Sequence, residues 1–106
     1  MIKIEIFRDL QGDVEGFKIV GHANTAPHGK DIVCAAVSTL AQTALLGVES
    51  YLGKPVDYNI SSGNLQMRLM SKPDELTNAI FETMILGLSE IENINPKSVQ
   101  ILEHGR

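Results

Sequence analysis

Residues 31–53 read DIVCAAVSTLAQTALLGVESYLG, and this stretch decides the fold class. Its apolar residues recur at steps of three and four, which is the spacing of one buried face on an amphipathic helix. Asp31 is a typical N-cap, Gly53 a typical helix end, and Pro55 blocks continuation, so we predict a helix over about 31–51. Because its other face is polar, the helix is expected to lie on a sheet with that face in water.

Strands are predicted on both sides of this helix because apolar and polar residues alternate there. Residues 2–6 read Ile-Lys-Ile-Glu-Ile, and a turn at 11–13 leads into a second strand that ends near residue 21. After the helix, residues 56–60 and 65–69 alternate about the turn residues Ser-Ser-Gly-Asn. Each pair of strands is predicted to form an antiparallel hairpin.

A second amphipathic helix is predicted to start between Ser71 and Asp74 and to end before Pro96, and a last strand is predicted over 98–102. The residues expected to be buried on this helix are Leu76, Ile80, Met84, Leu88 and Ile91, and Met67 and Met70 are also expected in the core. We therefore predict one α+β domain over residues 1–106, in the order β-β-α-β-β-α-β. It is a two-layer sandwich of a mostly antiparallel sheet and two helices.

The composition excludes several classes of protein. The chain has 106 residues, 43% hydrophobic and 21% charged, which is typical of a soluble globular domain rather than a disordered or collagen-like one. No apolar run approaches the roughly 20 residues needed to span a membrane, and the start MIKIEIF lacks the apolar core of a signal peptide. The net charge of −4 argues against binding nucleic acid directly and leaves a basic protein as a partner.

Cys34 is the only cysteine, which excludes an intrachain disulfide and a zinc site built on cysteine pairs. This cysteine usage favours the reducing cytoplasm. The three histidines, His22, His28 and His104, have no partners at metal-ligand spacing. We therefore expect no metal and no other cofactor.

Cys34 lies in the first turn of the predicted helix, where backbone N–H groups and the helix dipole favour a thiolate and could bind an oxyanion. His22 lies twelve positions earlier (34 − 22), at the end of a strand on which the helix folds back. From spacing alone, a small core cysteine and a satisfied strand-end histidine are the commoner interpretation. A nucleophile and its general base are the alternative.

Three further features surround this pair. Asp31 is explained by capping alone, but it could also orient His22. Ser38 lies one turn after Cys34 and could bond a substrate or hold His22, or simply bond back to its own helix. The polar segment 23–30 is predicted to be a loop that could cover the site.

The string Gly21-His22-Ala23, followed by GKDIVCAAVS at residues 29–38, resembles the ribosomal-processing cysteine protease family called Prp. The resemblance extends over essentially the whole chain. It implies that His22 is the general base, that Cys34 is the nucleophile, and that Gly21, Asp31 and Ser38 support the site.

The same resemblance implies a bacterial cytoplasmic endopeptidase that acts as a homodimer. Its substrate would be the precursor of ribosomal large-subunit protein L-twenty-seven, cut after a hydrophobic stretch to remove an N-terminal extension. Two other hypotheses stay open from the residues themselves. One is a non-catalytic, dimerising, ribosome-associated module with Cys34 in the core. The other is small-ligand binding at the sheet, which has no sequence feature of its own.

Overall fold

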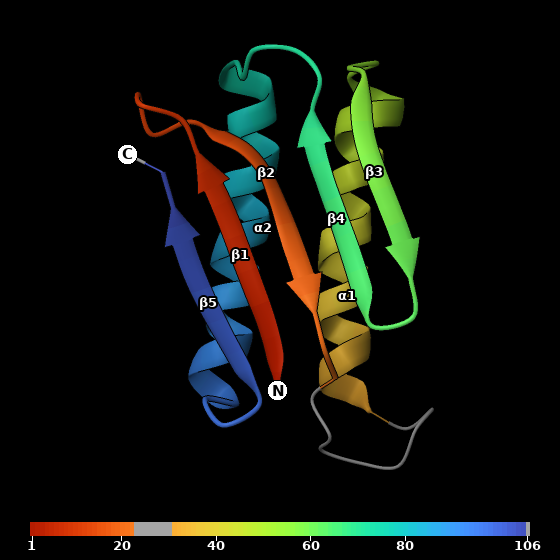
Figure 1. The fold of residues 1–106 in the computed structure, drawn as a ribbon, viewed down its shortest axis with the longest axis vertical. Coiled ribbons are helices and arrows are strands. Elements are labelled where there is room, and N and C mark those ends of the chain that lie inside the picture. The colour runs from red at the N-terminus through yellow and green to blue at the C-terminus, as the bar shows by residue number, and fades with distance from the viewer. Residues whose placement is uncertain (23–30, 106) are drawn as a thin grey trace.

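The computed structural model, which describes residues 1–22 and 31–105, confirms the predicted class and order of elements (Figure 1). The elements are β1 (Ile2–Arg8), β2 (Val14–Val20), α1 (Ile32–Leu46), a π-helical turn η1 (Gly47–Tyr51), β3 (Val56–Ser61), β4 (Asn64–Leu69), α2 (Glu75–Ile94) and β5 (Val99–His104). The five strands form one sheet in the order β3-β4-β2-β1-β5. Neighbouring strands are antiparallel except β1 and β5, which are parallel, and α2 connects β4 to β5.

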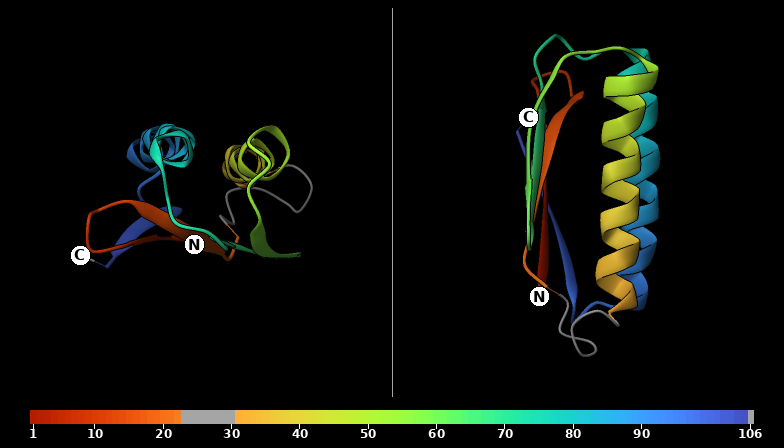
Figure 2. Two further views of the ribbon diagram at one scale, coloured as in Figure 1. Left: turned by 90° about the horizontal axis from the view of Figure 1, so that it is seen from above. Right: turned by 90° about the vertical axis from the view of Figure 1, so that its right-hand side faces the viewer.

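Both helices cover the same face of the sheet, as the edge-on view in Figure 2 shows. Alternation along the strands sends one set of side chains toward the helices, so Ile4 and Ile6 of β1 are fully buried. Phe17 of β2 meets Phe81 of α2 edge to face, with ring centroids 6.0 Å apart. The hydrophobic core therefore lies between one face of the sheet and the helix layer.

The helical segment formed by α1 and η1 is unusually apolar for a helix that is partly exposed to solvent. Residues 32–51 contain a window of mean hydropathy 1.6, long and apolar enough by those criteria to cross a membrane. The sequence expectation that no such run exists is therefore wrong. The residues buried against the sheet and α2 are Val33, Val37, Ala41, Ala44 and Leu45. This packing identifies α1 as the core helix of a compact, soluble, globular protein.

The second helix begins later than its sequence signals indicated, but it buries the predicted face: Met84 and Leu88 are buried, and Ile80 and Ile91 pack against the core. Asp74 is the N-cap: its Oδ1 accepts the Thr77 N–H at 2.9 Å, and Thr77 Oγ1 accepts the Asp74 N–H at 2.9 Å. Leu76 is 59% exposed because it lies about 100° around the helix from Thr77, which faces the core. Met70 is 67% exposed because it follows β4 on the side opposite the buried residues of that strand. Both core predictions are therefore wrong.

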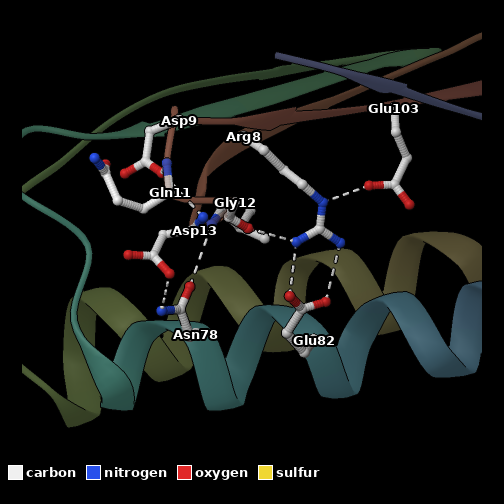
Figure 3. A network of polar contacts seen from close by, with 9 residues as sticks. Arg8, Asp9, Gln11, Gly12, Asp13, Asn78, Glu82 and Glu103 are labelled. Carbon is white, nitrogen blue, oxygen red and sulfur yellow. Dashed lines mark hydrogen bonds and ion pairs between the residues drawn. The ribbon is translucent and has the colours of Figure 1, made fainter. Parts of the chain in front are cut away.

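Arg8 joins the end of β1 to α2 and β5 (Figure 3). Its guanidinium donates to the two carboxylate oxygens of Glu82 at 2.7 and 3.1 Å and to the Gly12 carbonyl at 2.9 Å, and it pairs with Glu103. The hydrogen bond from Arg8 lowers the pKa of Glu82 below its ordinary 4.5, against the opposing effect of partial burial. This network fastens the first hairpin to the helix layer.

Replacing Arg8 with methionine is expected to lower the free energy of unfolding by about 1–2 kcal/mol near pH 7, since the bidentate pair is lost but Glu82 stays solvated. A carboxyl whose folded-state pKa is lowered stabilises the fold above its unfolded pKa, and that stability disappears as the pH falls through the folded value. The difference between wild type and variant should therefore shrink below about pH 4. Urea unfolding at pH 7 and pH 3 measures this difference in the free energy of unfolding, and Lys97→Met, at an exposed position, is the control. If the difference is as large at pH 3 as at pH 7, the prediction is wrong.

Candidate active site

A cleft of about 570 Å³ lies at one end of the sheet. Its walls come from the end of β2, the N-terminal half of α1 and the turn between β3 and β4, which lie at the same end of the molecule in Figure 1. The strand order explains this meeting, because β2 pairs with β4 and so brings its end beside the β3–β4 turn. All the residues that the sequence singled out as site candidates line the cleft: Gly21, His22, Asp31, Cys34 and Ser38.

The N-terminus of α1 presents Cys34 to the cleft. Asp31 is the N-cap, and its Oδ1 accepts the N–H groups of Val33 at 3.0 Å and Cys34 at 3.1 Å. Cys34 is therefore the third helical residue, as predicted. Its side chain is half-buried and packs against the core while also lining the cleft. The thiol thus lies at the boundary between the core and the open site.

The same capping contradicts one expectation about this helix end. The N–H groups of Val33 and Cys34 are not open to an oxyanion, because both donate to the Asp31 carboxylate. That carboxylate also opposes the effect of the helix dipole on a thiolate. An oxyanion can use these two donors only after Asp31 releases them.

The backbone on both sides of His22 is fixed by hydrogen bonds. The Gly21 N–H donates to the Gly63 carbonyl at 2.9 Å, and the Met1 ammonium donates to the His22 carbonyl at 2.7 Å. Gly21 has φ +104°, and a Cβ there would lie 2.3 Å from the Met1 carbonyl oxygen, so only glycine fits. His22 itself is exposed and lines the cleft, so a well-held backbone presents its ring to solvent.

Gly63, which the sequence analysis treated only as a turn residue, lies directly against the His22 ring. A Cβ added to Gly63 would lie 2.7 Å from His22 Nε2 and 3.2 Å from Cε1. The residue also has φ +71°, which favours glycine in the two-residue turn. Its position in a serine-rich turn was visible in the sequence, but the contact depends on the pairing of β2 with β4.

Ser38 lines the cleft one turn beyond Cys34. Its hydroxyl accepts a hydrogen bond from Gln42 Nε2 at 2.9 Å, within the same helix. This bond joins two side chains, so it differs from the bond back to the helix that the sequence analysis named as one of three roles. Since a hydroxyl also carries a proton to donate, Ser38 can still offer a hydrogen bond to a group in the cleft.

One further predicted feature falls outside the described residues, and one histidine falls outside the cleft. The loop predicted over 23–30, with His28 in it, lies outside the described residues. His104 lies on β5, where its Nε2 is 3.0 Å from Glu5 Oε1 and its ring stacks on Phe7, so it is not part of the cleft. Within residues 1–22 and 31–105, no group of three or more His, Cys, Asp or Glu side chains could hold a metal ion.

A thiol at a helix N-terminus and an imidazole in one cleft are the groups that thiol-dependent hydrolases use. Residues 1–100 match the family model described as cysteine protease Prp. The chain therefore belongs to the cysteine protease Prp family, and it is a hydrolase of the cysteine protease class.

Individual relatives agree with this assignment. The ribosomal processing cysteine protease Prp of Bacillus subtilis is 31% identical over 98 residues, which cover 87% of this chain and 88% of the relative. The Staphylococcus aureus protein of the same name is 27% identical over 105 residues, with 95% and 97% covered. A crystal structure of S. aureus Prp with a covalently linked product peptide superposes with a TM-score of 0.92 at 24% identity, covering 98% of this chain and all of that one. At this identity, the similarity to the crystal structure shows that the two chains share a fold.

Proposed function

We propose that this protein is an endopeptidase that removes the N-terminal extension from the precursor of ribosomal large-subunit protein L-twenty-seven. The observation that carries the proposal is that the chain's one cysteine and His22 line the same cleft. Relatives named ribosomal processing cysteine proteases support the substrate class, and the peptide covalently linked in the S. aureus structure supports a peptide substrate. A net charge of −4 suits a basic ribosomal protein, and such a substrate implies a reaction in the cytoplasm.

The mechanism that this site supports is acyl transfer through a thioester. Cys34 Sγ attacks the scissile carbonyl carbon while His22 takes the thiol proton and passes it to the leaving amine. His22 then removes a proton from the water that hydrolyses the thioester, and Cys34 leaves as the thiol. The reaction needs no cofactor.

The other candidate residues have supporting roles in this mechanism. Gly21 fixes the backbone that carries His22. Asp31 caps the helix of Cys34 and must release the amides that it holds if they are to bind the oxyanion. Ser38 lines the cleft beside Cys34, where its hydroxyl can donate to the substrate backbone.

The proposal predicts that the purified protein cuts a synthetic peptide spanning the extension junction at one bond, located by mass spectrometry of the two products. Prior treatment with iodoacetamide should abolish cleavage, because Cys34 is the only thiol in the chain. Buffer exchange without the reagent is the control. If the treated protein cuts the peptide as fast as the untreated protein, the non-catalytic module becomes the better description.

We also propose that the protein acts as a homodimer that pairs through its helix layer. Leu46 of α1 and Leu86 of α2 are 56% and 70% exposed, and residues 32–48 contain no charged side chain. Two copies can bring the uncharged α1 segments together without like-charge repulsion, although each chain carries a net charge of −4.

The wild-type protein is therefore expected to have about twice the chain mass of 11.6 kDa in analytical ultracentrifugation. Leu86→Glu should shift the mass toward that of one chain, because it buries a charge at the interface. Leu10→Glu is the matched control, since Leu10 is 86% exposed in the turn between β1 and β2 and belongs to neither helix. Equal masses for the two variants would exclude the helix layer as the interface.

A further inference from the structure

We propose that the free edge of β3 binds the substrate as an added, extended strand and leads it into the cleft. This inference rests on the proposed function and specifies how the same site holds a peptide. It starts from the strand order, in which β3 and β5 are the two edges of the sheet. An edge strand presents unpaired N–H and C=O groups that another chain can pair with.

The register identifies which backbone groups of β3 are open. The Met70 N–H donates to the Pro55 carbonyl at 3.0 Å, so this pair is a hydrogen-bonded one. Hydrogen-bonded and non-hydrogen-bonded pairs alternate along an antiparallel ladder. Residues 56, 58 and 60, opposite 69, 67 and 65, are therefore in non-hydrogen-bonded pairs with β4. Their N–H and C=O groups point outward, away from the sheet.

The side chains at these positions add apolar contact surface. Tyr58 and Ile60 lie opposite Met67 and Leu65, which are buried under the helices, so all four side chains share one face of the sheet. Tyr58 and Ile60 are nevertheless each 47% exposed, because the helix layer does not cover the edge. An extended peptide pairing with β3 would therefore place alternate side chains, preferably apolar ones, against Tyr58 and Ile60.

This edge leads directly into the catalytic cleft. Ile60 and Ser61 of β3 line the cleft together with His22 and Cys34. The opposite wall continues along α1 from Cys34 to Gln42, a rise of about 12 Å, which is the length of three to four extended residues. The cleft therefore lies between α1 and one end of the sheet, where the end of β3 forms part of its wall, and its α1 wall is long enough for a segment of peptide.

The other edge of the sheet differs in a way that favours β3. On β5, the Ile101 N–H donates to the Glu92 side chain of α2 at 2.7 Å, so one of its outward groups is already taken. Among the hydrogen bonds of residues 1–22 and 31–105, none takes the outward groups of Tyr58 or Ile60. Neither β3 nor β5 contains a lysine or proline, the residues that commonly protect an edge from pairing, so the bond at Ile101 is what distinguishes the two edges. The edge beside the cleft is thus the one left open.

The test uses the junction peptide and a series of derivatives, each N-methylated at one backbone amide. N-methylation removes one N–H donor, so kcat/KM should fall about tenfold at alternate residues on one side of the scissile bond and change little at those between. On the protein, Tyr58→Ser and Ile60→Ser should each raise KM about tenfold with kcat unchanged. Asn59→Ser is the control, because Asn59 lies between them on the opposite face.

The outcomes separate this inference from the proposed function. If the wild-type protein does not cut the unmodified peptide, the proposed function fails and the inference falls with it. If the peptide is cut but N-methylation shows no alternation, or the Tyr58 and Ile60 variants match Asn59→Ser, only the docking on β3 is overturned.

Discussion

Replacing Cys34 with serine is expected to reduce the rate of peptide cleavage by at least about 10³-fold. A hydroxyl is far less acidic than a thiol, so the environment that activates a thiol leaves serine a poor nucleophile. Because serine is nearly the same size and Cys34 is only half-buried, the free energy of unfolding should change by less than about 1 kcal/mol. Initial cleavage rates and urea unfolding of the same preparations measure the two effects.

His22→Ala provides the second arm of this experiment. Loss of a general base should slow cleavage by about 10²–10⁴-fold and should also slow alkylation of Cys34 by iodoacetamide. If the two residues act as a unit, as the proposed mechanism requires, the double variant should be no slower than Cys34→Ser alone. Thr43→Ser, on the exposed part of α1 outside the cleft, is the control. Wild-type cleavage rates in Cys34→Ser would contradict the nucleophilic role.

Features that depend on neighbours in the sequence were predictable. The cap at Asp31 follows from the residue type and its place before an apolar stripe, and it puts Cys34 in the first turn. The strands follow from alternation, and the order β-β-α-β-β-α-β is enough to give the fold class. Local signals failed where two of them competed, as at the start of α2, where the capping box of Asp74 and Thr77 replaced the earlier signal at Ser71.

Features that depend on contacts between distant segments were not predictable. The pairing of β2 with β4 joins strands separated by the whole of α1, and it alone places the β3–β4 turn beside His22. In the same way, the open edge of β3 follows from its terminal position in the sheet, which hairpin signals do not specify. The sequence therefore indicated the two residues proposed to react but not the surfaces that hold them.

Replacing Gly63 with alanine is expected to lower kcat for peptide cleavage about 10- to 100-fold, because the added Cβ would lie 2.7 Å from His22 Nε2 and displace the ring. The effect should fall on kcat rather than KM, since in the proposed mechanism His22 acts on the proton of Cys34 and not on substrate affinity. The imidazole resonances of His22 should shift in two-dimensional NMR spectra, while those of His104, on β5 and bonded to Glu5, should not.

A variant at Gly53 distinguishes the effect of the contact with His22 from the effect of backbone strain. Gly53 and Gly63 have φ +68° and +71°, but a Cβ on Gly53 would meet nothing within 4 Å. Gly53→Ala should therefore destabilise the fold by about 1 kcal/mol, as Gly63→Ala also should through strain, yet leave kcat unchanged. Gly63→Asn is the second control, because asparagine tolerates positive φ but still carries a Cβ. If Gly63→Asn cleaves at the wild-type rate, strain explains the alanine variant. If both Gly63 variants lose kcat while Gly53→Ala does not, the absence of a Cβ at Gly63 is what allows the His22 ring to keep its position.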